Sequence, residues 1–265
     1  MIPVYSISKP FLAQAVLELG VPLGDSIGKH VQGLAPVYAS RKIAALLNHT
    51  SGLADYGYLN DYHAAVDARE TAWSRQALLD RSLVFPHTFR GFQYSNIGYL
   101  LLRMLVEEAT GLEYFEALER LVFHPFEISG VAKWEVTTDV VPGYDPRWVY
   151  SGTFLSDPAM IAQSLAKVLK GRHDKFGFGE RGLTAGLLPV GHANTGMQNP
   201  GYGYGVMADA GFEPGHLPKF IGHGGGGPGF GLMTLVNTQT WQGELEFATE
   251  GFDQAAAIRR LIENT

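Results

Sequence analysis

The sequence predicts an α+β fold, in which helices occupy the first part of the chain and antiparallel strands follow. Three observations support this class. Amphipathic segments of helical period fill residues 6–169, short strand-like runs separated by Gly, Pro and Asn follow residue 171, and an amphipathic segment closes the chain. Because helices and strands do not alternate, a parallel βαβ sheet is not expected.

The helix predictions rest on apolar residues three or four positions apart and on recognisable ends. Residues 96–110 give the clearest helix, which Gly111 terminates, and Asp157 followed by Pro158 opens another that we expect to end near Leu169, before Gly171. The predicted helices are residues 6–19, 40–47, 70–83, 96–110, 112–123, 157–169 and 253–263.

The strand predictions fall in the last third of the chain, where turn residues separate short apolar runs. In residues 244–248, Leu245 and Phe247 alternate with two glutamates, so one face of that strand is expected to be wet. The predicted strands are residues 202–207, 220–223, 232–237 and 244–248.

Composition excludes several classes of protein. The 265 residues are 46% hydrophobic and 17% charged, which is too apolar for intrinsic disorder. The net charge of −6 without a basic run argues against a nucleic-acid partner, and no apolar stretch is long enough to span a membrane. Cysteine is absent, and the nine histidines form neither H-E-x-x-H nor H-x-H, so we expect no metal and no cofactor.

Glycine is concentrated at one place. The chain has 33 glycines, and seven of them lie within residues 222–231. Glycine lets a ligand approach the backbone closely, so this cluster suggests a site built from main-chain groups.

Ser6-Ile7-Ser8-Lys9 is an S-x-x-K motif at the start of a predicted helix. Residues three apart share a helix face, so a neutral lysine amine could take the serine proton. The pairs Ser26–Lys29 and Ser164–Lys167 have the same spacing. Ser26 lies in a Gly/Pro-rich loop and Ser164 inside an ordinary helix, whereas helix-terminal N–H groups at Ser6 could stabilise an oxyanion.

Two further motifs are compatible with the same chemistry. Tyr94-Ser95-Asn96 precedes the clearest helix and would offer a proton carrier and an amide, although a buried tyrosine beside a helix cap, or the competing Tyr58–Asn60, fits the pattern too. His223-Gly224-Gly225 ends an apolar strand within the glycine cluster, where backbone N–H groups could polarise a carbonyl, unless the segment is simply a mobile turn.

Two other patterns lack the context they need. Gly24–Gly28 fits G-x-S-x-G, but no buried strand precedes it, as an α/β-hydrolase elbow requires. Gly222–Gly227 fits G-x-G-x-x-G, but a strand rather than a helix follows, so a dinucleotide site is not expected.

Together the motifs and the residues that flank them resemble the class C β-lactamase-like serine hydrolases. This is the superfamily of penicillin-binding proteins, D-aminopeptidases and related esterases. The resemblance also covers the run His49-Thr50-Ser51-Gly52-Leu53, the segment 149–157 and the C-terminal helix. It implies one domain of two lobes, with residues 21–150 in a mostly helical lobe and residues 1–20 and 151–265 in a lobe that contains an antiparallel sheet. The site would lie in the cleft between them.

The same resemblance implies roles for individual residues. Ser6 looks like the acylated nucleophile and Lys9 the amine that activates it, while Tyr94 looks like a general base and proton shuttle. Asn96, His223 and Gly225 would bind substrate, and the N–H groups of Ser6 and Gly226 would form the oxyanion hole. Whether Lys9 or Tyr94 is the base stays open, because a charged Lys9 would favour a Tyr94 phenolate.

This sequence departs from the family pattern in two respects. Penicillin-recognising members commonly carry Lys-Thr-Gly where His223-Gly224-Gly225 stands, so we expect weak or no β-lactamase activity. Members also place two strands before the S-x-x-K motif, where this chain has five residues. We therefore expect an exposed sheet edge, through which copies of the chain would associate.

The expected function is hydrolysis of small-molecule or peptide acyl substrates, as esters, amides or D-amino-acid peptides, through an acyl-enzyme on Ser6. The alternative is a catalytically silent relative that binds such ligands or acts as a sensor. No export signal stands at the start of the sequence, and localisation stays open.

Overall fold

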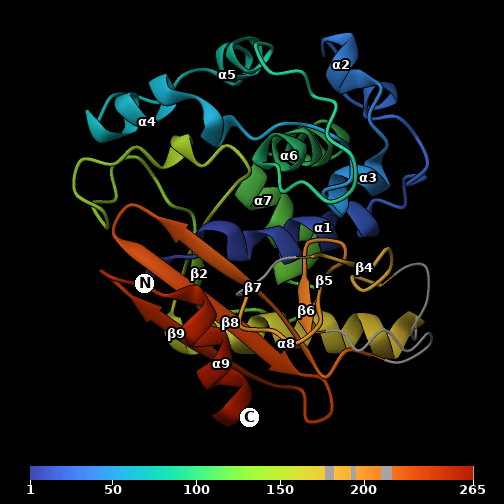
Figure 1. Cartoon of the computed structure of the whole chain (residues 1–265), viewed down its shortest axis with the longest axis vertical. Coiled ribbons are helices and arrows are strands. Elements are labelled where there is room, and N and C mark those ends of the chain that lie inside the picture. Colours follow the sequence, from blue (N-terminus) through green and yellow to red (C-terminus); the bar gives the residue numbers. More distant parts are fainter. Residues whose placement is uncertain (177–181, 192–194, 210–216, 265) are drawn as a thin grey trace.

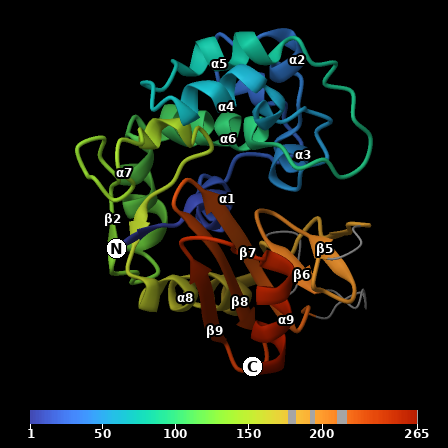
Figure 2. The ribbon, with the colours of Figure 1, turned by 60° about the vertical axis from the view of Figure 1, so that its left-hand side comes forward.

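Helices and strands are segregated in space as well as along the chain. The computed structural model describes residues 1–176, 182–191, 195–209 and 217–264. Helices α2 to α6 gather on one side, and strands β4 to β9 with helices α8 and α9 lie on the other (Figures 1 and 2). The predicted α+β class is therefore confirmed. The α-helices are α1 (Ser8–Glu18), α2 (Pro36–Ala39), α3 (Ile43–Leu47), α4 (Asn60–Asp67), α5 (Arg75–Ser82), α6 (Asn96–Thr110), α7 (Tyr114–Leu118), α8 (Pro158–Phe176) and α9 (Gln254–Asn264).

The main sheet is antiparallel throughout, with its strands in sequence order from β4 to β9. A smaller sheet has the order β1-β3-β2 and ties the start of the chain to the segment before α8. The strands are β1 (Ile2–Pro3), β2 (Val131–Ala132), β3 (Leu155–Ser156), β4 (Leu188–Pro189), β5 (Pro200–Tyr202), β6 (Met207–Asp209), β7 (Phe220–Gly227), β8 (Phe230–Asn237) and β9 (Gln242–Ala248).

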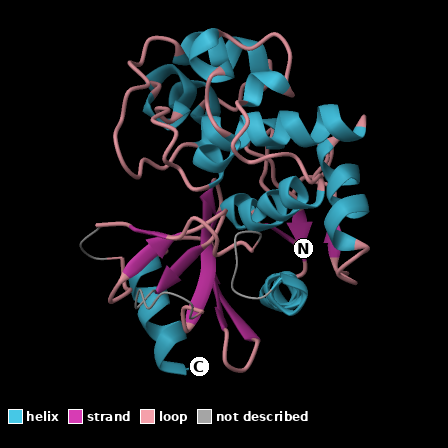
Figure 3. Ribbon diagram, turned by 90° about the vertical axis from the view of Figure 1, so that its right-hand side faces the viewer, coloured by secondary structure: helices cyan, strands magenta, loops and turns pink. Residues whose placement is uncertain are grey.

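Helices cover both faces of the sheet. Along β8, Met233 and Leu235 join the cluster that contains the buried residues of α9, whereas Leu232 and Val236 join the main core. This alternation is the period of two expected for a strand buried on both faces. Figure 3 shows α9 on one side of the strands and α8 on the other.

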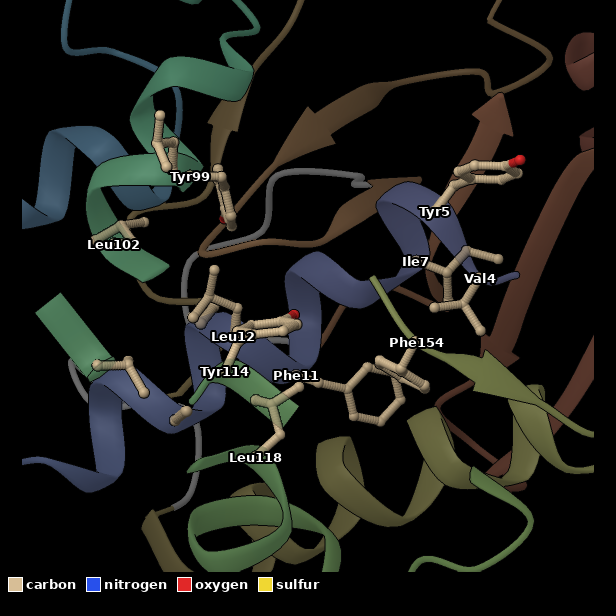
Figure 4. Packing of buried hydrophobic residues seen from close by; sticks show 14 of the residues in the cluster. Val4, Tyr5, Ile7, Phe11, Leu12, Tyr99, Leu102, Tyr114, Leu118 and Phe154 are labelled. Carbon is tan, nitrogen blue, oxygen red and sulfur yellow. The ribbon is translucent and has the colours of Figure 1, made fainter. Parts of the chain in front are cut away.

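Helix α1 passes through the centre of the molecule. Every residue from Ser8 to Val16 is buried. The ring of Phe11 packs edge-on against that of Phe154, with centroids 5.5 Å apart (Figure 4). It packs in the same way against Phe123, with centroids 6.0 Å apart. A helix that is apolar on all sides is typical of a core position. A polar side chain on α1 must therefore find its partners inside the protein.

Most predicted elements have different bounds in the structure, and contacts explain the difference for three of them. The helix expected over 70–83 begins at Arg75, because Ser74 caps it by accepting from the N–H of Ala77. The helix expected to end at residue 169 continues to residue 176. Gly171 does not stop it, since this glycine provides space for the ring of Phe126, which would lie 3.0 Å from a Cβ.

The strand predicted over 202–207 was also wrong. Residues 203–206 form the turn between β5 and β6, and Gly205 has a φ of +74°, which does not occur in a strand. The N–H of Gly203 donates to the carbonyl of Val206 and closes this turn.

Strand β9 stands at the end of the strand order and has one neighbour, β8, among the described residues. Phe247 on this strand is 43% exposed. Association of copies through this edge stays a prediction. Within the described ranges, no helix is long and apolar enough to cross a membrane.

Candidate active site

The three sequence motifs meet in one place. Ser6 lies in a 3-10 turn (Tyr5–Ile7) that leads into α1, and Lys9 follows in the first turn of that helix. Tyr94 and Asn96 lie at the start of α6, and His223 lies on β7. Residues far apart in sequence therefore converge where the helical side of the molecule meets the sheet.

Lys9 is the centre of this arrangement. Its Nζ lies 2.9 Å from Ser6 Oγ, 2.8 Å from Asn96 Oδ1 and 3.5 Å from Ser151 Oγ. The residue is 0% exposed. Burial disfavours the charged ammonium and lowers the pKa of Lys9 from 10.5 to about 7, although the nearby charge of Asp55 opposes this shift. A substantial fraction of Lys9 is therefore neutral near pH 7.

Tyr94 lies beside Lys9 and Ser6. Its ring centroid is 5.1 Å from Lys9 Nζ, and its hydroxyl interacts with the side chain of Ser6. Burial raises the pKa of Tyr94 above its ordinary range, and the interaction with Ser6 offsets only part of this effect. Tyr94 is thus a neutral phenol over the pH range in which Lys9 titrates.

Local contacts fix the Tyr94–Asn96 segment. Ser95 caps α6, because its Oγ accepts from the N–H of Gly98 while the same hydroxyl donates to the carbonyl of Ala54 at 2.8 Å. The backbone N–H of Ser95 donates to Nδ1 of His49 at 3.1 Å. His49, in the run His49–Leu53, therefore holds the backbone of the Tyr94–Asn96 motif in place.

A chain of buried hydrogen bonds links His49 to His223 through Tyr202. Nε2 of His49 lies 3.2 Å from the Tyr202 hydroxyl, which lies 2.9 Å from Nε2 of His223. Nδ1 of His223 is 2.5 Å from the carbonyl of Gly224. The N–H of Ser95 must donate and the carbonyl of Gly224 must accept, so the bonds run in one direction with both histidines neutral.

Burial and the nearby charge of Lys9 lower the pKa of His223 from 6.5 to about 3. The same two causes lower the pKa of His49 well below its ordinary value. Both ring nitrogens of His223 have partners in the protein, so the imidazole lines the site as a neutral group and not as a cation.

The glycines of β7 allow the serine turn to lie directly on the sheet. A Cβ at Gly225 would lie 2.5 Å from the carbonyl oxygen of Val4, and one at Gly227 would lie 2.4 Å from the ring of Tyr5. A Cβ at Gly226 would have no atom within 4 Å. The glycine cluster found in the sequence thus serves the close approach of two backbones, with Gly226 beside open space.

A cavity of about 520 Å³ opens in front of these groups. Its polar lining includes Ser6, Tyr94 and Gln254, and the backbone of residues 224–226 forms part of its wall. No lysine or arginine is among the residues that line it in the described part of the chain. Its apolar lining includes Phe92, Val190, Met197, Pro200, Met207, Phe252 and the ring of Tyr202.

The competing motifs have other partners. Lys29 pairs with Asp25, and Lys167 donates to the carbonyl of Glu127 at 2.6 Å. Within the described part of the chain, neither lysine forms a hydrogen bond with the serine three residues before it. The hydroxyl of Tyr58 accepts from Gln93, and this residue is 52% exposed. The residues of the competing motifs therefore make contacts away from the site, and their spacing carries no catalytic meaning.

Sequence reasoning missed three residues that contact the motif residues. Asp55 accepts from the backbone N–H of Asn96 at 2.5 Å, Ser151 contacts Lys9, and Tyr202 joins the two histidines. Ser151 lies inside the segment 149–157 noted for its family resemblance, whereas nothing in the sequence marks Asp55 or Tyr202. Among the described residues, no group of three His, Cys, Asp or Glu side chains could hold a metal.

Solved structures with the same fold cover nearly the whole chain. A D-stereospecific amidohydrolase from Streptomyces sp. is 22% identical with a TM-score of 0.77, over 100% of this chain and 87% of that one. A penicillin-binding protein from Bacillus halodurans is 20% identical with a TM-score of 0.72, over 99% and 85%. A D-amino acid amidase from Ochrobactrum anthropi SV3 is 20% identical with a TM-score of 0.68, over 98% and 82%. The predicted β-lactamase/transpeptidase-like fold is confirmed.

Sequence comparison gives the same assignment. Penicillin-binding protein 4* of Bacillus subtilis (strain 168) is 33% identical over 129 residues, which are 45% of this chain and 28% of that relative. The matched segment thus spans little more than a quarter of that relative's length. The family model described as Beta-lactamase matches residues 1–248. The chain therefore belongs to the Beta-lactamase family, as its resemblance to the class C-like members predicted.

Proposed function

We propose that this protein is a serine hydrolase that transfers acyl groups through an ester on Ser6. The observation that carries the proposal is the contact between Lys9 Nζ and Ser6 Oγ, 2.9 Å long, made by a completely buried lysine. A serine becomes nucleophilic when a neighbouring base takes its proton, and a desolvated amine is such a base near neutral pH.

In the proposed acylation, neutral Lys9 takes the hydroxyl proton as Ser6 Oγ attacks the substrate carbonyl. The N–H groups of Ser6 and Gly226 would receive the oxyanion. The Tyr94 hydroxyl would relay the proton from Lys9 to the leaving group, so that Tyr94 ends as a phenol and Lys9 as a neutral amine. Lys9 would then take a proton from the water that attacks the ester and return it to Ser6 Oγ as the acid leaves. Lys9 is favoured over Tyr94 as the first base, because burial raises the pKa of Tyr94 and makes its phenolate costly.

The substrate class follows from the cavity. Its lining is largely apolar, and His223 is neutral where penicillin-recognising members carry a cation. We therefore propose neutral substrates with an apolar acyl group, as esters, amides or D-amino-acid derivatives, and little or no β-lactamase activity. The names of the amidohydrolase and amidase neighbours agree with this proposal. We also propose that residues 21–150 and the remainder form two lobes around this cavity.

The decisive test combines turnover with detection of the covalent intermediate. A panel of p-nitrophenyl acyl esters and D-amino-acid amides is assayed with the wild type, a Ser6→Ala variant and a Ser26→Ala control from the rival motif. The wild type and Ser26→Ala should turn over at least one substrate and gain one acyl group by intact mass, whereas Ser6→Ala should do neither. A folded wild type with no turnover and no adduct would instead identify a catalytically silent relative.

A further inference from the structure

Asp55 is a buried carboxylate beside the site that belongs to none of the motifs. It is 8% exposed, and it caps the 3-10 turn Tyr56–Tyr58 by accepting from the N–H of Gly57 at 2.6 Å through Oδ1. Its other oxygen, Oδ2, accepts from the backbone N–H of Asn96 at 2.5 Å. Since these partners all donate, the surroundings suit the ionised carboxylate even though burial raises its pKa.

Asn96 connects Asp55 to Lys9. Its backbone N–H donates to Asp55 Oδ2, while its side-chain Oδ1 accepts from Lys9 Nζ at 2.8 Å. Asp55 therefore holds the residue whose amide oxygen contacts the lysine.

We propose that Asp55 is a positioning residue for proton transfer at Ser6. Its carboxylate holds the backbone of Asn96 at the start of α6, and the amide oxygen of Asn96 holds Lys9 beside the serine hydroxyl. Asp55 touches neither the substrate nor the reacting atoms, and it acts through Asn96 and Lys9. This inference rests on the proposed function, because it assigns Asp55 a part in the same proton transfer.

The charge of Asp55 acts on Lys9 as well. Burial lowers the pKa of Lys9, and Asp55 is the charged group that raises it. The rings of Tyr94 and Tyr99 have their centroids 5.1 and 5.3 Å from Lys9 Nζ. The other neighbours of Lys9 come from three further segments and are Ser151, His49 and His223. Both histidines are held neutral, so Asp55 supplies the negative charge in this set. Removing it should lower the pKa of Lys9 below its present value of about 7.

The test is the pH dependence of kcat/KM for Asp55→Asn with a neutral p-nitrophenyl ester. If neutral Lys9 is the base, activity rises as Lys9 loses its proton. The acid limb of the profile should then move by about one pH unit to lower pH in the variant. The plateau should fall about 10- to 100-fold, because the backbone of Asn96, and with it the amide oxygen on Lys9, is held less firmly.

Asp145→Asn is the matched control. Asp145 is 7% exposed and accepts from the backbone N–H groups of Ala72 and Arg147, both at 2.9 Å, so its burial and backbone contacts resemble those of Asp55. It also pairs with the Arg147 guanidinium at 2.8 Å, so this control removes a buried carboxylate together with an ion pair. Asp55, and not Asp145, acts on the pKa of Lys9. The control should keep the acid limb of the wild type. A folded Asp55→Asn variant with an unmoved limb and plateau would overturn the proposal, and an unmoved limb with a lower plateau would reduce Asp55 to a structural role.

A second readout separates this inference from the proposed activity. NMR titration of protein carrying ¹³C at the lysine ε carbon follows Lys9 directly, with a Lys9→Ala variant to assign its signal. The Lys9 titration should move to lower pH in Asp55→Asn and stay in place in Asp145→Asn. If the wild type shows no turnover but Lys9 moves as expected, the proposed function fails while the coupling of Asp55 to Lys9 stands. If Lys9 does not move, the coupling is refuted whatever the activity.

Discussion

Substituting alanine at two adjacent glycines of β7, Gly225 and Gly226, should have different effects on stability. A methyl group at Gly225 would lie 2.5 Å from the carbonyl oxygen of Val4, against 3.4 Å for an ordinary contact, so the serine turn and the strand must separate by about 0.9 Å. Overpacking of this kind costs about 1–3 kcal/mol, which lowers the Tm of a protein of this size by about 2–12 °C.

The same displacement should reduce activity. Moving the serine turn by about 1 Å relative to the backbone N–H of Gly226 misplaces one half of the proposed oxyanion hole, and a misplacement of that size costs about 10²-fold in rate. We therefore expect Gly225→Ala to lower kcat on a p-nitrophenyl ester by about that factor. Thermal unfolding followed by circular dichroism gives the Tm of the same preparation.

Gly226→Ala is the matched control for stability. Its methyl group would meet nothing within 4 Å, and its backbone lies outside the left-handed region. The loss of unfolded-state entropy should leave the Tm unchanged or raise it by about 1–3 °C. Gly225→Ala with the wild-type Tm and kcat would refute the packing of the serine turn against β7.

Three further predictions concern single groups of the site. Tyr5→Phe removes the 2.5 Å hydrogen bond from the tyrosine hydroxyl to the Pro228 carbonyl but keeps the ring against Gly227. The Tm should therefore fall by about 2–4 °C in a thermal scan. An unchanged Tm would contradict a stabilising role for this hydrogen bond. The pKa of His223 is about 3 in the folded protein and about 6.5 in the unfolded chain, so the unfolded chain binds more protons between these two pH values. The free energy of unfolding should therefore fall by about 1 kcal/mol for each pH unit below 6.5. Urea unfolding from pH 7 to pH 4 should show a shallower decline for His223→Asn, and equal slopes would contradict this. Benzylpenicillin should be hydrolysed no faster than its neutral methyl ester, whereas a roughly 10- to 100-fold preference for the free carboxylate would reveal a cation in the site.

Local signals in the sequence were enough for elements whose ends are marked by side chains. The helix over 96–110 has its predicted bounds because the cap at Ser95 and the left-handed Gly111 both stand in the sequence. The predicted helix end before Gly171 was wrong, because the sequence does not distinguish a glycine that ends a helix from one that gives space to an aromatic ring. The strand over 202–207 failed because alternating apolar residues outweighed the turn signal of two glycines.

The site divides in a similar way. Ser6 and Lys9 are joined by helix geometry, and the order of the three motifs along the chain was sufficient to group the remaining candidates. Asp55 and Tyr202 were missed because their roles depend on contacts across 41 and 21 residues of sequence, to Asn96 and to His223. The neutral state of His223 likewise follows from its buried partners, which no spacing rule provides.

The central claim is that Ser6 is the residue that becomes acylated. The most direct measurement is tandem mass spectrometry of the protein quenched during turnover of a slow acyl ester. Because Pro10 follows Lys9, trypsin should release Ser6 within the peptide Met1–Lys29, which also contains Tyr5, Ser8 and Ser26. The account predicts an acyl group on Ser6 in the wild type and its absence from the Lys9→Ala variant. An acyl group on any other residue, or turnover without acylation of Ser6, would contradict it.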